Sequence, residues 1–166
     1  MLDNLTAIEK GYIIPSGLNS VPKREFAYYG DYFETPKVGD VVYCKVTSVS
    51  QHVRLENKQG RIHNLYKGTY FIGVFGNRYA PDQFEAIIPR RRLKNVDLFS
   101  WGGLVGQVVN KNDAMRDPTR VEVLGYVHNK NGQRVNTLNY QAVRPRFDEV
   151  KKPRSKMILV CGTAMN

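Results

Sequence analysis

Cationic side chains gather in one short stretch, "IPRRRLKN", which runs from Ile88 to Asn95 and contains Arg90, Arg91, Arg92 and Lys94. Guanidinium groups match phosphate oxygens in geometry and charge. On a strand, Arg90, Arg92 and Lys94 would share one face at intervals of about 6.5 to 7 Å, which a nucleic-acid backbone can follow. The stretch therefore predicts a polyanion-binding surface. The alternative is a solvated strand edge whose charges prevent pairing with another sheet.

A second candidate is the polar loop "FGNRYAPDQFEA", from Phe75 to Ala86, between two apolar runs. Loops held by rigid strands often carry binding residues. We take Asn77, Arg78 and Tyr79 as candidate ligand contacts. The alternative is internal bonding, in which Arg78 pairs with an acid of the same loop and Asn77 bonds the backbone.

Residues that act as nucleophiles, general bases or metal ligands are few and scattered. The histidines are His52, His63 and His128. His52 and His63 would face each other across a predicted hairpin, but no further ligands follow at a zinc spacing. Ser48 and Ser50 lie in no nucleophile-elbow pattern, and no pair of acids is placed for acid–base catalysis. We expect neither a metal site nor a catalytic residue in this chain.

Positive charge is concentrated in the main body of the chain. The formal net charge is +10 and the isoelectric point is about 9.7; residues 1–36 carry a net charge of −2 and residues 37–166 one of +12. Such a surplus attracts polyanions, nucleic acid first and acidic proteins second. No stretch approaches the roughly 18 apolar residues that span a bilayer. Cys44 and Cys161 match no disulfide framework, so we expect a cytoplasmic protein.

Short apolar runs recur about every ten residues from Val38 onward, the spacing of an all-β domain. The run "VGDVVYCKVTSVS" alternates, with Val42, Cys44 and Val46 on one face. Both "HVRLENKQGRIHNLY" and "HNKNGQRVN" predict hairpins, the second through its Asn-Gly pair. With no convincing amphipathic helix in between, the sequence predicts a small antiparallel β-barrel, or a sandwich. Glycines in or beside the runs favour the barrel.

Two flanking segments differ from this pattern. Residues 1–37 are punctuated by turns and crowd five aromatic rings together: Phe26, Tyr28, Tyr29, Tyr32 and Phe33. We expect an irregular aromatic strap laid across the β-barrel domain of residues 38–140; the alternative is a platform on which bases stack. Residues 141–155, rich in proline and basic side chains, predict a linker.

The chain closes on "KMILVCGTAMN", Lys156 to Asn166, an apolar run that breaks into Gly162 and Thr163. This resembles the first strand and phosphate-loop start of P-loop NTPases of the dethiobiotin synthetase and MinD-like class. The resemblance implies that residues 156–166 begin a truncated NTPase domain, with Gly162, Thr163 and Asn166 in an incomplete phosphate loop. The alternative is an ordinary C-terminal strand.

The same resemblance implies a bacterial parent protein that binds ATP and Mg²⁺ through a C-terminal P-loop domain. The phosphate-binding lysine and the hydroxyl that holds Mg²⁺ would follow Asn166, so we expect no cofactor in this chain. The predicted role is a non-catalytic accessory barrel that recruits nucleic acid or an acidic protein partner. The alternatives are a stand-alone nucleic-acid-binding barrel and a structural or oligomerising barrel.

Overall fold

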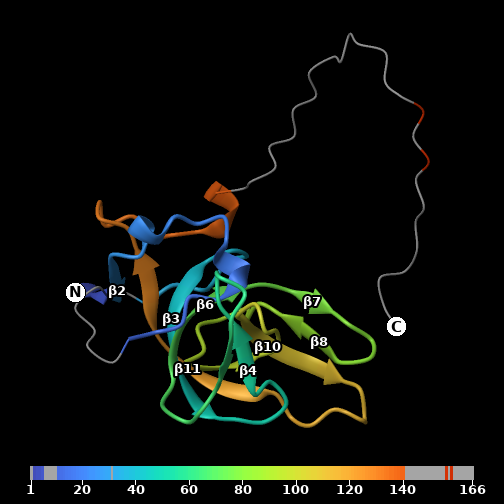
Figure 1. Cartoon of the computed structure of the whole chain (residues 1–166). Coiled ribbons are helices and arrows are strands. Elements are labelled where there is room, and N and C mark those ends of the chain that lie inside the picture. The colour runs from blue at the N-terminus through green and yellow to red at the C-terminus, as the bar shows by residue number, and fades with distance from the viewer. Residues whose placement is uncertain (1, 6–10, 31, 141–155, 157, 159–166) are drawn as a thin grey trace.

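The computed structural model describes residues 2–5, 11–30, 32–140, 156 and 158 (Figure 1). The predicted linker and the residues of the proposed phosphate loop, Gly162, Thr163 and Asn166, lie outside this range. In chain order the elements are β1 (Leu2–Asn4), η2 (Ser16–Leu18), η3 (Lys23–Glu25), β2 (Tyr28–Gly30), β3 (Val41–Ser48), β4 (Arg54–Glu56), β5 (Ile62–Asn64), β6 (Tyr70–Phe75), β7 (Arg78–Tyr79), β8 (Phe84–Ile87), β9 (Asn95–Leu98), β10 (Leu104–Lys111), β11 (Thr119–His128) and η4 (Thr137–Tyr140).

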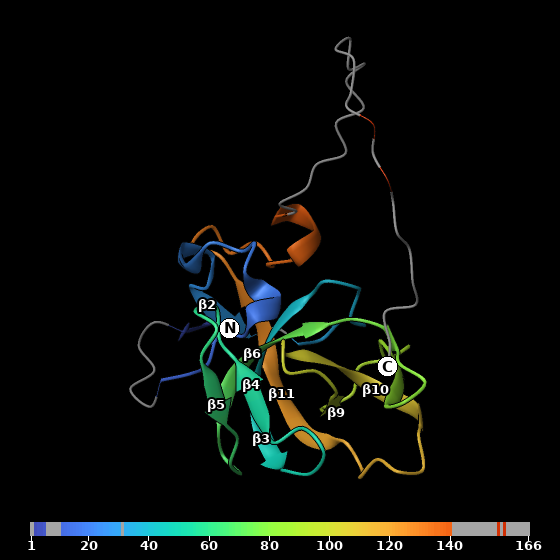
Figure 2. The same cartoon turned by 45° about the vertical axis from the view of Figure 1, so that its right-hand side comes forward.

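Five strands form a closed ring of hydrogen bonds, and the prediction of an all-β fold is confirmed. Around the ring β11 pairs with β3, β3 with β6, β6 with β10, β10 with β9, and β9 with β11. Strands β2 and β1 extend the sheet beyond β11, and β8 and β7 extend it beyond β10 (Figures 1 and 2). Strands β4 and β5 form a separate two-stranded sheet.

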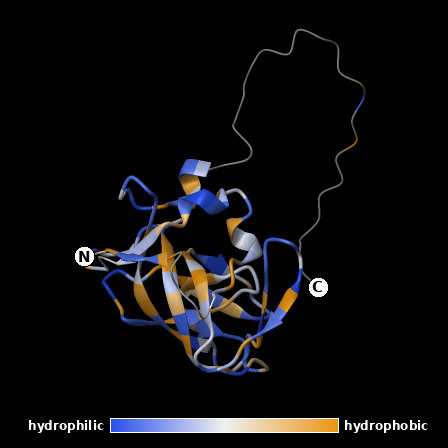
Figure 3. Cartoon of the chain, turned by 60° about the vertical axis from the view of Figure 1, so that its left-hand side comes forward, coloured by the Kyte–Doolittle hydropathy of each residue, from blue (hydrophilic) through white to orange (hydrophobic). Residues whose placement is uncertain are grey.

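The alternation in β3 separates two cores. Val42, Cys44 and Val46 point into one buried cluster, whereas Val41 and Tyr43 point into another. Both faces of this strand are therefore buried in its first half, where alternation predicted only one buried face. Figure 3 shows the apolar residues concentrated along the strands and the polar residues in the turns.

One pair differs from the predicted antiparallel arrangement. Strands β6 and β10 run parallel, with Leu104 opposite Val74 and Val105 opposite Phe75. A parallel pair needs a long crossover, and here it is supplied by residues 76–103, which contain β7, β8 and β9. Side chains alternate in both kinds of pair, so the sequence pattern could not distinguish them.

The described residues of the strap cover the outer face of β3 and β6. Leu5, Leu18, Val21 and Phe26 are buried there, in the same cluster as Tyr43 and Ile72. Fully burying each such side chain stabilises the fold by about 1.5 to 3 kcal/mol. The strap also joins the sheet, because β2 pairs with β11 and β1 pairs with β2.

The predicted hairpins around "NKQG" and "HNKNGQRVN" are both confirmed. In the first, Leu55 of β4 lies opposite His63 of β5. In the second, Asn129 N–H donates to the Gln133 carbonyl, and Gly132 supplies the positive φ of 74° that the turn needs.

Candidate nucleic-acid interface

The common face that Arg90, Arg92 and Lys94 would share on a strand is not found, although the four cations do follow a strand, β8. Strand β8 ends at Ile87 and β9 begins at Asn95, so the four cations lie in an irregular loop and the shared face is not formed. Pro89 accounts for this break, since proline has no N–H for a sheet and restricts the residue before it.

Two of these four side chains also have protein partners. Arg92 donates a hydrogen bond to the Tyr32 carbonyl at 3.1 Å, and Lys94 pairs with Glu122 at 2.9 Å. Arg90 and Arg91 are exposed. The loop therefore presents two of the four predicted cations without a partner among the described residues.

The loop candidates Asn77 and Arg78 bond to the protein itself. Asn77 Oδ1 accepts the Ile88 N–H at 2.8 Å. The Arg78 guanidinium donates to the Phe99 carbonyl, and at 2.8 Å to Oε1 of Gln83. Burial lowers the pKa of Arg78. Tyr79 is 75% exposed and lines a hollow of about 220 Å³ with Glu85 and Lys111.

The predicted opposition of His52 and His63 is not found. His63 lies on β5, while His52 precedes β4 and packs against the ring of Phe84, with 5.6 Å between ring centroids. Among the described residues no three His, Cys, Asp or Glu side chains are placed to hold a metal ion. No helix in the described part of the chain has the length and apolar character needed to cross a bilayer.

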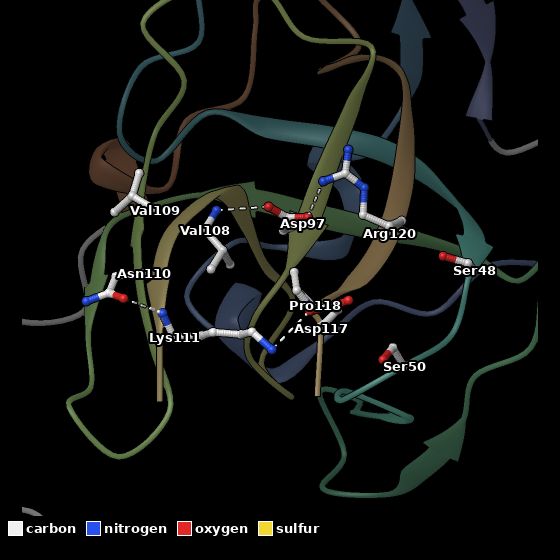
Figure 4. A pocket seen from close by; sticks show the side chains of 10 residues that line it. All are labelled: Ser48, Ser50, Asp97, Val108, Val109, Asn110, Lys111, Asp117, Pro118 and Arg120. Carbon is white, nitrogen blue, oxygen red and sulfur yellow. Dashed lines mark hydrogen bonds and ion pairs between the residues drawn. The ribbon is translucent and has the colours of Figure 1, made fainter. Parts of the chain in front are cut away.

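A groove of about 690 Å³ lies where β10 separates from β9 and β11 (Figure 4). Asp97 is buried in its wall, accepting the Val108 N–H at 2.9 Å and pairing with Arg120. Lys111 pairs with Asp117 at 3.0 Å. Each cation in the lining is thus matched by an acid, so this groove offers little attraction to a polyanion.

A different arrangement surrounds the β4–β5 hairpin. Residues 11–15 lie between the hairpin and β6: Ile13 N–H donates to the Tyr70 carbonyl, and Lys58 N–H donates to the Ile14 carbonyl, both at 3.0 Å. Two neighbouring hollows share Tyr12 and Ile13. The first, of about 260 Å³, is lined by Tyr12, Ile13, Ile14, Lys23, Asn57, Lys58, Gln59 and His63. The second, of about 510 Å³, is lined by Gly11, Tyr12, Ile13, Lys67, Gly68, Thr69 and Tyr70.

The lining of the two hollows is cationic. It contains Lys23, Lys58 and Lys67, and no Asp or Glu occurs among the residues that line either hollow. Lys45 lies beside the second hollow, with its Nζ 5.7 Å from the centroid of the Tyr70 ring. We call Lys23, Lys45, Lys58 and Lys67 the hairpin basic face.

Lys58 is partly buried, unlike the exposed Lys23 and Lys67. Its Nζ donates a hydrogen bond to the Val21 carbonyl at 2.5 Å, and burial lowers the pKa of its ammonium group. No carboxylate among the described residues lies within ion-pair distance of it. An ammonium that has lost part of its hydration and lacks an anionic partner is stabilised when an anion binds.

Aromatic rings adjoin the cations. Tyr70 stacks on Tyr43 with 5.6 Å between centroids and 16° between planes, and Tyr12 meets Tyr43 edge-on at 5.9 Å. Tyr12 and Tyr70 are only partly buried; Tyr12 is among the residues that line both hollows, and Tyr70 is among those that line the second. Cationic grooves flanked by aromatic rings are typical of surfaces that bind single-stranded nucleic acid.

Comparison with protein-family models, curated proteins and solved structures finds no match to this chain. The case for an interface therefore depends on the geometry above. Sequence reasoning missed it because Lys23, Lys58 and Lys67 belong to separate segments that only the folded strap and hairpin bring together. The sequence did offer one indication of this interface: Lys58 lies in the predicted "NKQG" turn, where a side chain can reach a ligand.

Proposed function

We propose that this chain is a non-catalytic binding domain that holds nucleic acid on the hairpin basic face. The observation that carries the proposal is the pair of neighbouring hollows, lined by three lysines and by no described acid. The other large groove has its cations paired with acids, and in the Arg90–Lys94 loop Lys94 is paired with Glu122 while one N–H of Arg92 is used by the Tyr32 carbonyl.

Electrostatics favours this assignment over a merely solvated surface. Partly buried charges are screened less by salt than fully exposed ones, so a phosphate that enters the first hollow would interact more strongly with the partly buried Lys58 than with the exposed Lys23. Three or four such contacts correspond to the sequence-independent class of nucleic-acid binding, with dissociation constants of about 10⁻⁴ to 10⁻⁶ M at physiological salt.

The P-loop parent is a separate proposal. If the resemblance of residues 156–166 holds, the domain serves as an accessory module that keeps nucleic acid beside an ATP- and Mg²⁺-dependent NTPase. If it does not hold, the same face would serve a stand-alone nucleic-acid-binding protein. Binding by the hairpin basic face is common to both cases, so it is the part to test first.

Amide chemical shifts locate the interface directly. Titrating a single-stranded 12-mer into isotopically labelled protein should shift the amides of Lys58, Gln59, Lys67 and Gly68 most. Shifts centred on Arg90–Lys94 would instead show that the interface is the basic loop that the sequence predicts. Shifts at neither place, with no binding to double-stranded DNA or RNA, would reject nucleic acid as the partner and favour an acidic protein.

A further inference from the structure

We infer that the first hollow, beside the β4–β5 turn, binds the terminal phosphate monoester of a nucleic-acid strand. This inference rests on the proposed function and adds to it the part of the ligand that is recognised. The second hollow would then hold diester phosphates of the same strand. A terminal phosphate carries a charge of about −1.5 to −2 at neutral pH, whereas each diester carries −1.

The charges of the first hollow match a dianion. Lys23 and Lys58 both line it, and no described acid does so. Only one of the three N–H donors of Lys58 is used by the Val21 carbonyl, so two remain for a ligand. The second hollow has one lysine in its lining, Lys67, with Lys45 nearby over the Tyr70 ring.

The turn that forms one wall of the hollow is held in place by its own hydrogen bonds. Asn57 Oδ1 accepts the N–H groups of Gln59 at 3.0 Å and Arg61 at 2.9 Å. Its amide nitrogen therefore faces His63 Nε2, 2.9 Å away, and donates to it. Lys58, which is part of this turn, is consequently presented from a fixed backbone, which reduces the entropy lost on binding.

Size also separates the two hollows. At about 260 Å³ the first lies just below the range of about 300 to 1,000 Å³ that takes drug-sized ligands, so it suits a phosphate with part of a nucleotide. The second, at about 510 Å³, is broader and lies next to it through Tyr12 and Ile13. A strand whose end enters the first hollow can continue into the second.

The test compares two 12-mers of one sequence, with a 5′-phosphate or a 5′-hydroxyl, by fluorescence anisotropy at fixed salt. A third arm carries the phosphate at the 3′ end. We expect one phosphorylated end to bind about tenfold more tightly than the hydroxyl form, since it adds a charge beside two ammonium groups. Inorganic phosphate should abolish that preference.

Lys58→Gln should remove the preference, because it deletes the charge while retaining an N–H donor for the Val21 carbonyl. Lys67→Gln is the matched control: it should lower the affinity for all three 12-mers by a similar factor, so that the ratio of their affinities stays the same. Equal affinity of the three probes for the unmodified protein would overturn the inference but leave the proposed function intact. Binding of none of them would overturn both. A preference that persists in Lys58→Gln and in Lys23→Gln would place the phosphate elsewhere and overturn the inference.

Discussion

The Lys58 ammonium donates a hydrogen bond to the main-chain carbonyl of Val21, across 37 residues of sequence. This bond ties the β4–β5 hairpin to the strap, and it brings Lys58 into the same hollow as Lys23. The cationic hollow thus exists only where strap and hairpin are both folded.

Replacing Lys58 should have a small and chemically specific effect on stability. Lys58→Met leaves the Val21 carbonyl without its donor, so we expect a loss of about 1 kcal/mol in the free energy of unfolding. Lys58→Gln should lose less. Urea denaturation measures both, with Lys67→Met as the control, which should stay within about 0.5 kcal/mol of the unmodified protein. Equal stability of all three variants would mean that the bond contributes nothing.

His52 should make the protein less stable in mild acid. This residue is 6% exposed, and its Nδ1 has no hydrogen-bond partner in the part of the chain that the structure describes. Burial, and to a smaller extent the nearby positive charge of Arg78, together lower the pKa of His52 from 6.5 to about 4. The unfolded chain therefore takes up a proton as pH falls below about 6.5, while the folded protein does so only near 4.

The contribution of neutral His52 to the free energy of unfolding is complete above about pH 6.5 and is lost as the pH falls toward 4. Between pH 7.5 and 5 this amounts to about 2 kcal/mol. The measurement is the free energy of unfolding of the unmodified protein and of His52→Gln at both pH values, since the difference removes the contributions of other groups. An identical pH dependence of the two proteins would contradict the assignment.

The strap should tolerate no side chain at Gly17. A Cβ atom there would lie 2.4 Å from the carbonyl oxygen of Gly102, which also accepts the Gly17 N–H at 3.1 Å. Gly17→Ala should therefore cost about 1 to 3 kcal/mol, the range for overpacked sites. Gly102→Ala is the matched control from the same contact, because its Cβ would meet nothing closer than 3.5 Å. Thermal denaturation of the two variants should rank Gly17→Ala clearly lower.

Arg134 should stabilise the end of the sheet both by stacking its planar guanidinium on the Tyr126 ring and by its charge. Its guanidinium carbon lies 3.8 Å from the centroid of the Tyr126 ring, and its nitrogens lie 2.9 Å from Glu34 and 3.5 Å from the buried Asp40. Arg134→Ala should cost about 2 kcal/mol. Arg134→Lys should recover only part of this, since an ammonium cannot stack on the ring. Chemical denaturation with Arg91→Ala as an exposed control provides the comparison; full recovery by lysine would limit the effect to charge.

Much of the fold follows from local pattern, and much of the site does not. The alternation of Val42, Cys44 and Val46 and the Asn131–Gly132 turn were sufficient to predict a strand and a hairpin, because both depend on neighbouring residues. The spacing of Arg90, Arg92 and Lys94 suggested a common face on a strand, but the chain leaves the sheet before Pro89 and returns to it only at Asn95.

The candidate interface depends on contacts between distant residues. Ile13 bridges to Phe71, and Pro15 bridges to Asn57, which places the strap between β6 and the hairpin. Sequence spacing does not encode these pairings, so it gave no reason to group Lys23 with Lys58. Charge counting indicated a polyanion partner but could not locate the surface.

The salt dependence of nucleic-acid binding tests the central claim most directly. Each phosphate neutralised on a single strand should contribute about −0.7 to the slope of log affinity against log salt, so three lysines should give a slope of about −2. The triple variant Lys23→Gln, Lys58→Gln, Lys67→Gln should bring this slope close to zero while remaining folded. The double variant Arg90→Gln, Arg91→Gln should keep most of it. A slope that survives the hairpin substitutions but disappears with the arginine pair would contradict the account.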